Sequence, residues 1–166
     1  MHLAQLPPLP SDYVLRIPRY LEATSLVDVG FDSAGRQAYL TPATANAWQS
    51  MKSAASNSGF NLVLVSAFRS YAYQEQILQR KLSQGISWTD ILTVSAFPGF
   101  SEHHTGRAID IGSPNSLDLT ESFEHTAEFE WLFDRAALFG FHMSYPRGNR
   151  FGIAYEPWHW AFQNAG

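Results

Sequence analysis

The sequence SEHHTGRAID, residues 101–110, joins a polar loop to a short apolar strand. Gly106 lets the chain turn sharply between the two, because glycine adopts backbone conformations that other residues avoid. The strand is apolar except for Asp110, and an ionised carboxylate is costly to bury unless it is paired or bound to a metal. His103 precedes the turn and could meet Asp110 at one ion. The spacing fits equally well an Asp110 that pairs with an arginine, with ordinary loop histidines nearby.

A second polar cluster lies in YEPWHW, residues 155–160. Pro157 and the aromatic residues predict a turn that enters a strand. His159 stands between two tryptophans and should be desolvated. A buried neutral imidazole is a good zinc ligand, but when this feature is considered alone, a histidine that only packs in the core is the commoner case. Glu156 could serve as a general base beside a metal. Together with the first cluster, His103, Asp110 and His159 offer three ligands, and a catalytic zinc site has three protein ligands and one open position.

A third cluster is SAFRSYAYQ, residues 66–74. A strand is expected to end at Ser66 and a helix to begin after Tyr71, which leaves Arg69 at the mouth between them. A guanidinium fixed there can bind a carboxylate in bidentate fashion or stabilise an oxyanion. An ordinary surface arginine is the commoner case.

The order of the predicted elements indicates an α+β fold: a single domain with a small antiparallel sheet flanked by helices. Residues 1–20 are proline-rich and are expected to be extended, without a helix. We divide the chain into residues 1–39, this segment with an expected hairpin, and a core at residues 40–166. We expect the hairpin at 27–40, helices at 43–58, 73–84, 88–92 and 123–139, a loop at 95–106, and strands at 60–67, 108–111, 141–145 and 158–162.

Composition narrows the function. The 166 residues include no cysteine, so any metal must be held by His, Asp or Glu. Aromatic residues make up 14% and the net charge is −4, which excludes a disordered chain and gives no overall basic surface for nucleic acid. No apolar run is long enough for a membrane span. The N-terminus lacks a signal peptide, which predicts a cytoplasmic protein, or a periplasmic or cell-envelope protein if a leader was removed.

The three clusters together resemble a known family. The sequence is similar to the VanY-type zinc D-alanyl-D-alanine carboxypeptidases, within the group that includes the VanX dipeptidases and the hedgehog signalling domain, and the resemblance implies their fold. It spans roughly residues 40–162, and three ordered motifs argue against a chance match. The matching residues are Ser101, His103, Gly106, Ala108 and Asp110, then Glu156-Pro157-Trp158-His159, and Ser66, Arg69, Ser70 and Gln74.

The resemblance implies a role for each position. Glu156 would be the general base, and Arg69 would stabilise the oxyanion or the scissile carbonyl. His104 occupies a variable family position and is not expected to be a ligand. One Zn²⁺ would be held by His103, Asp110 and His159. The pocket for the substrate's terminal carboxylate would be lined by Gln74, Ser101, Ser144 and Tyr145.

The implied function is removal of the terminal D-alanine from a peptidoglycan stem peptide or muropeptide, by L,D- or D,D-cleavage. We expect a monomer. The missing leader favours L,D-cleavage of recycled muropeptides. Two alternatives remain: an endopeptidase that cuts an L-Ala–D-Glu bond, and a non-catalytic hedgehog-like zinc-binding module. The presence of both Glu156 and Arg69 argues against an inactive site.

Overall fold

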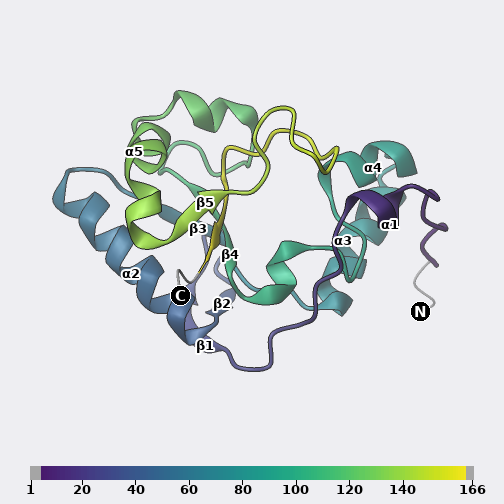
Figure 1. Ribbon diagram of the computed structural model, residues 1–166, viewed down its shortest axis with the longest axis horizontal. Coiled ribbons are helices and arrows are strands. Elements are labelled where there is room, and N and C mark those ends of the chain that lie inside the picture. The colour runs from purple at the N-terminus through teal and green to yellow at the C-terminus, as the bar shows by residue number, and fades with distance from the viewer. Residues whose placement is uncertain (1–4, 164–166) are drawn as a thin grey trace.

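A four-stranded antiparallel sheet lies at the centre of the chain, which the computed structural model describes over residues 5–163 (Figure 1). The strand order is β3-β4-β6-β5, and β1 and β2 form a separate antiparallel hairpin. The predicted α+β fold with a small antiparallel sheet is confirmed, as is the hairpin. The strands are β1 Val27–Phe31, β2 Gln37–Leu40, β3 Val63–Ser66, β4 Ala108–Gly112, β5 Phe141–Met143 and β6 His159–Phe162.

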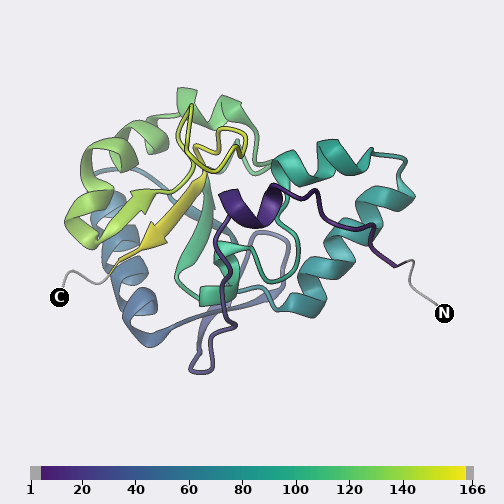
Figure 2. The same ribbon diagram turned by 45° about the vertical axis from the view of Figure 1, so that its right-hand side comes forward.

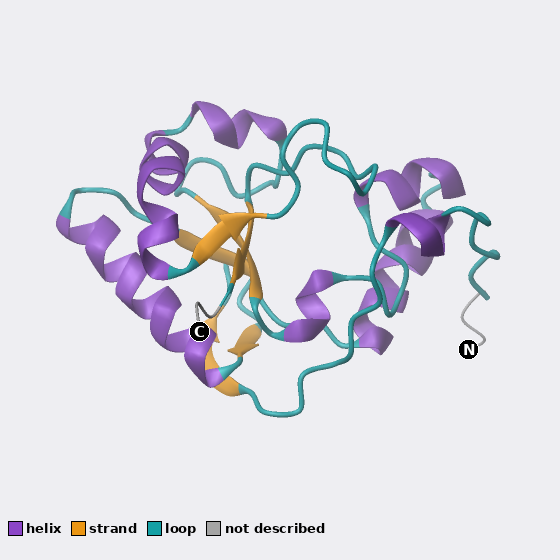
Figure 3. Cartoon of the chain, viewed as in Figure 1, coloured by secondary structure: helices purple, strands orange, loops and turns teal. Residues whose placement is uncertain are grey.

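Helices gather at both ends of the molecule, with the sheet between them (Figure 3). Within residues 5–163, no helix is both long and apolar enough to cross a membrane. The α-helices are α1 Tyr13–Arg16, α2 Pro42–Asn57, α3 Tyr71–Ser83, α4 Trp88–Val94 and α5 Ala127–Arg135, and the 3-10 turns are η1 Glu102–Thr105, η2 Glu121–His125 and η3 Ala136–Phe139.

The main core lies between the sheet and the helices α2 and α5. Trp48 and Met51 of α2 pack with the apolar residues of β4, and Leu132 of α5 completes the cluster. The strand β4 is buried along its whole length. Full burial of each large apolar side chain contributes about 1.5–3 kcal/mol. This core therefore keeps the strand that carries Asp110 rigid.

A second core joins α1, α3 and α4, at the other end of the molecule (Figure 2). Tyr13 and Ile17 are buried there against Leu78 and Ile91, and the Tyr13 hydroxyl accepts a hydrogen bond from the backbone N–H of Phe97. The expectation that residues 1–20 contain no helix is wrong, because α1 forms within them. Tertiary packing of one helical turn on this core outweighs the local effect of the prolines.

The prediction of one continuous helix at 123–139 is also wrong. The structure divides it into η2, α5 and η3, because Thr126 has an extended backbone and its hydroxyl caps α5 by accepting from the N–H of Phe129. Gly140, at φ 84°, ends η3. The expected loop at 95–106 contains the turn η1, which Ser101 caps. The remaining predicted helices and strands are present with shifted ends.

Candidate metal centre and active site

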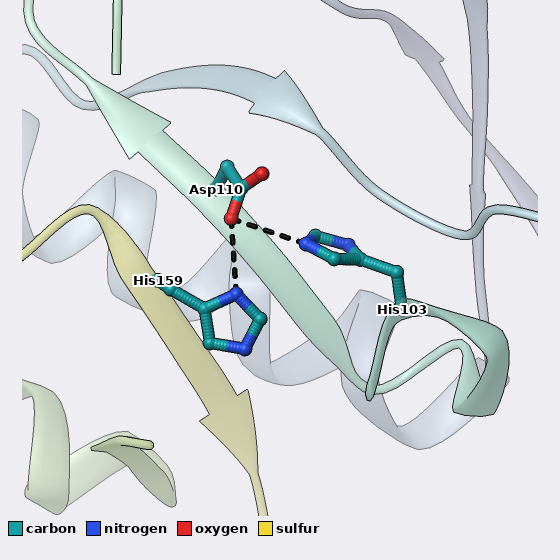
Figure 4. Close-up of side chains that lie close together, drawn as sticks. All are labelled: His103, Asp110 and His159. Carbon is teal, nitrogen blue, oxygen red and sulfur yellow. Dashed lines mark hydrogen bonds and ion pairs between the residues drawn. The ribbon is translucent and has the colours of Figure 1, made fainter. Parts of the chain in front are cut away.

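His103, Asp110 and His159 meet at the middle of the sheet (Figure 4). Asp110 and His159 are directly paired across β4 and β6, while His103 reaches them from η1. One ligand atom from each residue lies within 4.8 Å of the others. The Oδ1 atom of Asp110 lies 3.1 Å from Nε2 of His103 and 3.1 Å from Nδ1 of His159. Such a cluster of two imidazoles and a carboxylate suits zinc.

The turn at Gly106 brings His103 back beside the strand. Gly106 has φ 68°, in the left-handed region that glycine tolerates best. A Cβ atom there would lie only 2.9 Å from Leu26, so both the backbone and the packing require glycine. The predicted sharp turn is confirmed, and it explains how a loop histidine and a strand aspartate come together.

Each histidine is oriented by a hydrogen bond on its outer nitrogen. Nδ1 of His103 lies 2.7 Å from the carbonyl oxygen of Ala67, and Nε2 of His159 lies 2.8 Å from Oε1 of Glu102. When the outer nitrogen donates its proton to these acceptors, the inner nitrogen carries a lone pair that faces the cluster. Metal-binding histidines are held in this way. The donor set therefore fits a divalent cation such as zinc.

The pKa values describe this cluster without a cation. Burial, followed by the charge of Arg69, lowers the pKa of His103 to about 4, so its imidazole is neutral. Burial also opposes charge on His159, but its hydrogen bonds to Asp110 and Glu102 outweigh burial and raise its pKa to about 10. Both ring nitrogens of His159 face carboxylates, which favour the protonated imidazole. Binding of a metal by such a residue is coupled to release of a proton.

Asp110 uses its two oxygens differently. Oδ1 faces the histidines, whereas Oδ2 accepts a hydrogen bond from Nη2 of Arg69 at 2.9 Å. Burial opposes the ionised form, but His103 and Arg69 hold the pKa of Asp110 well below its usual range. Both interpretations of Asp110 offered by the sequence are therefore present at once. It pairs with an arginine and belongs to the candidate metal cluster.

Arg69 is fixed by three side chains. Besides Asp110, its Nε donates to Oγ of Ser66 at 3.0 Å and its Nη1 donates to Oε1 of Gln74 at 3.1 Å. Its side chain is 17% exposed. A guanidinium has five N–H donors, so two are left for a ligand once these three bonds form. Arg69 is a preorganised cation at the wall of the cleft, not an ordinary surface arginine.

Glu156 lies just before β6 and lines the same cleft as the cluster. Its backbone N–H donates to the carbonyl oxygen of Tyr145, and its Oε2 lies 3.7 Å from Nδ1 of His159. Burial raises the pKa of Glu156 to about 7, partly offset by His159. A carboxylate with a pKa near neutrality can both accept and return a proton.

These groups line a cleft of about 530 Å³, large enough for a short peptide. Three of the four expected substrate contacts, Gln74, Ser101 and Tyr145, line it. The amide of Gln74 is bonded at both ends, to Arg69 and to the carbonyl of Ala96, and Oγ of Ser101 accepts from the N–H of His103. The ring of Tyr145 packs against the ring of His159, and the two ring centroids lie 4.7 Å apart. Substrate binding by these residues stays a prediction.

Glu102 was not among the residues singled out from the sequence. Its Oε1 receives hydrogen bonds from Nε2 of His159 and from Oγ of Ser144 at 2.5 Å. Ser144, expected to contact substrate, therefore supports the carboxylate that orients His159. Burial opposes the negative charge of Glu102, yet the bonds from His159 and Ser144 lower the pKa of Glu102 to about 2. The available signal was an acidic residue between Ser101 and His103 without an assigned role.

His104 is buried but lies outside the cluster, as expected. Its Nδ1 lies 2.7 Å from the carbonyl oxygen of Arg69, and its Nε2 accepts from the N–H of Gly99. Both bonds go to the backbone of segments that border the cleft. His104 therefore holds Arg69 and the segment before η1 in place.

Comparisons with known proteins point to one family. Residues 37–165 match the VanY family model, described as D-alanyl-D-alanine carboxypeptidase. The putative carboxypeptidase YodJ of Bacillus subtilis is 36% identical over 137 residues, 80% of this chain and 50% of YodJ. The bifunctional D-Ala-D-Ala dipeptidase and carboxypeptidase VanXYC of Enterococcus gallinarum is 29% identical over 75% of this chain and 67% of its own length. The chain thus spans about half the length of YodJ.

Solved structures share the fold. The LdcB LD-carboxypeptidase, whose structure concerns peptidoglycan recognition, has a TM-score of 0.75 at 34% identity, over 85% of this chain and 69% of its own. The D,D-dipeptidase VanXYg, solved with a D-Ala-D-Ala phosphinate analogue, has a TM-score of 0.72 at 28% identity. The match covers 90% of this chain and 59% of VanXYg. A VanY D,D-pentapeptidase solved with Zn(II) is 23% identical, with a TM-score of 0.65. The match covers 98% of this chain and 86% of the pentapeptidase, and it shows a likeness of fold alone.

Proposed function

The chain belongs to the VanY family of D-alanyl-D-alanine carboxypeptidases, and we propose that it is a zinc-dependent carboxypeptidase. Its substrate would be a peptidoglycan stem peptide or muropeptide that ends in D-alanine. One observation carries this proposal: two histidines with outward-bonded nitrogens and an aspartate converge beside a buried glutamate. A structural zinc site would not need this glutamate, which would serve as the general base.

His103, Asp110 and His159 would hold one Zn²⁺ through Nε2, Oδ1 and Nδ1. When bound, zinc supplies a Lewis acid that lowers the pKa of water and polarises a carbonyl group. Glu156 would take the proton from the attacking water and return it to the amine nitrogen of the departing D-alanine.

Arg69 would support the reaction from the other side of the cluster. Its two remaining N–H groups would stabilise the negative charge that develops on the scissile carbonyl oxygen. Because Asp110, Ser66 and Gln74 already fix the guanidinium, it needs little reorganisation during the reaction. Removal of one such preorganised donor costs about 10²–10³-fold in kcat in other enzymes.

The L,D and D,D reactions differ in the stereochemistry on the acyl side of the bond, and the cluster suits both. Incubation of the zinc-loaded protein with a defined tetrapeptide and a defined pentapeptide, followed by mass analysis, distinguishes the two reactions. We expect loss of one D-alanine from at least one of them. An endopeptidase would instead release fragments from within the peptide, which the same spectra would show.

The variant Glu156→Gln tests the mechanism. We expect turnover to fall by at least 10²-fold while zinc remains bound in metal analysis, because the general base is lost and the ligands are kept. The exposed residue Glu130 on α5 offers a matched control, Glu130→Gln, which should keep the wild-type rate. A wild-type rate in Glu156→Gln would disprove the proposed role. Zinc binding without turnover by the wild type would instead indicate a non-catalytic module.

A further inference from the structure

Lys81 is a cation in the cleft that the proposed reaction does not use. Four residues of α3 line the cleft, Tyr73, Gln74, Ile77 and Lys81, and the last three have the spacing of one helix face. Lys81 is half-buried, and its Nζ donates to Oγ of Ser95 at 2.5 Å. Ser95 directly follows α4 and also lines the cleft. The lysine and serine thus form a polar end of the cleft, two helical turns beyond Gln74.

The charge of Lys81 lacks an acidic partner. Within residues 5–163, no carboxylate lies at ion-pair distance from its ammonium group. Burial, and next the charge of Arg69, lower the pKa of Lys81, and the more distant charge of Glu156 offsets this only in part, which agrees with a cation in an unfavourable site. Partly buried lysines are normally paired. An anion that enters the cleft would supply the partner.

The hydrogen-bond donors at this end are available. The ammonium group of Lys81 has three N–H donors, and one is used by Ser95; the hydroxyl of Ser95 accepts that bond, so its own O–H is left to donate. A carboxylate can accept from both groups at once. By contrast, the side chains of Gln74 and Ser144, which the sequence suggested for this purpose, are bonded within the protein.

We propose that Lys81 and Ser95 bind a carboxylate of the peptide substrate. The inference rests on the proposed carboxypeptidase function and adds a specificity-determining pair to it. Two groups of such a peptide have this chemistry: the free α-carboxylate of the terminal D-alanine, and the side-chain carboxylate of a diaminopimelate residue. A bound carboxylate would pair the ammonium of Lys81 and make binding depend on the charge of the peptide.

The test compares Lys81→Met with Lys52→Met, because these two are the only lysines of the chain. Lys52 is exposed on α2 and outside the cleft, so its variant is a matched control. The substrate is the shortest N-acetylated peptide that the wild type cleaves, with lysine before the D-alanine part, so that its only carboxylate is the terminal one. The same peptide is also made as a C-terminal amide, and with diaminopimelate in place of lysine.

We expect Lys81→Met to raise KM about 10- to 100-fold with little change in kcat, since it removes a charge-assisted hydrogen bond. If the partner is the terminal carboxylate, the rise occurs with both free-acid peptides and is absent for the amide. If it is the side-chain carboxylate, the rise is confined to the diaminopimelate peptide. Lys81→Arg, which keeps the charge, should recover part of the loss. Equal values for Lys81→Met and Lys52→Met on all peptides, or equal losses on acid and amide, would overturn the proposal.

Failure of the proposed function is distinguishable from failure of this inference. Wild-type protein that cleaves none of the peptides would refute the carboxypeptidase function. In that event, binding of N-acetyl-D-alanine and of its amide is followed by NMR shifts in the wild type and in Lys81→Gln. A preference for the acid that is lost in Lys81→Gln supports a site for the terminal carboxylate. The same comparison of N-acetyl-diaminopimelate with N-acetyl-lysine tests the side-chain carboxylate, and the absence of both preferences in the wild type rejects the proposal.

Discussion

The substitution Glu102→Gln tests the orientation of His159, a proposed zinc ligand whose outer ring nitrogen contacts the side chain of Glu102. The carboxylate of Glu102 accepts the proton on Nε2 of His159 at 2.8 Å and is itself held by Ser144. Glutamine has nearly the same shape but no charge, and its NH₂ group can be turned toward Nε2, which disfavours the tautomer needed for metal binding. The expected effect is weaker zinc binding rather than loss of the fold.

The magnitude follows from the type of contact. Loss of the partner that orients a metal-bound histidine costs about 10- to 100-fold in metal affinity, which corresponds to about 1.4–2.8 kcal/mol. Ser144→Ala removes one bond to the same carboxylate but leaves its charge, so we expect a smaller effect of about 1 kcal/mol, roughly fivefold. Zinc affinity should therefore be highest in the wild type, lower in Ser144→Ala and lowest in Glu102→Gln.

Competition with a chromophoric chelator measures these affinities directly. Glu130→Gln, the exposed control on α5, should match the wild type. A thermal unfolding curve of each metal-free variant separates metal affinity from stability. Zinc affinity of Glu102→Gln within twofold of the wild type would refute the reasoning that Glu102 fixes the tautomer of His159.

Three further predictions concern stability. Gly106→Ala should lower the free energy of unfolding by about 1–3 kcal/mol in urea titrations, because its Cβ meets Leu26 in a left-handed turn; Gly35→Ala, at φ 80° with open space, should lose less. Tyr13→Phe removes the acceptor of the Phe97 N–H and should cost about 1–3 kcal/mol in the same assay. Chelation with EDTA should lower the melting temperature and added zinc should restore it, since zinc at 100 times its Kd stabilises by about 2.7 kcal/mol; an unchanged melting temperature would contradict metal binding.

The candidate cluster was largely accessible from the sequence because its residues break local rules. Asp110 is a carboxylate in an otherwise apolar strand, and His159 is a polar residue between two tryptophans. Such positions need partners, and a short list of histidines limited the choices. The structure brings together His103, Asp110 and His159 as expected, with Glu156 beside them.

Other contacts were not accessible, because they join segments far apart in the chain. The bond from His159 to Glu102 spans 57 positions and that from Arg69 to Asp110 spans 41. No periodicity records such pairs: the sequence indicates that Asp110 and His159 need partners, but Glu102 and Arg69 would suit an exposed surface equally well. The helix α1 was missed for a related reason: its four residues are too few to form a stable helix alone, and they fold by packing against α3 and α4.

Electrostatic balance links the candidate metal centre to the end of the cleft at Lys81. With a divalent cation bound, the positive charges of the cation and of Arg69 are matched by three carboxylates, those of Glu102, Asp110 and Glu156. Two other charged residues line the cleft: Arg36 is paired with Asp32, and Asp118 is exposed, so that water and salt screen its charge. Lys81 is then a surplus cation, and one substrate carboxylate would neutralise it. If that carboxylate is the terminal one, a free-acid peptide completes the balance, whereas an amide leaves the ammonium unpaired. The charges around the candidate metal centre would then favour removal of a terminal residue over cleavage within a chain.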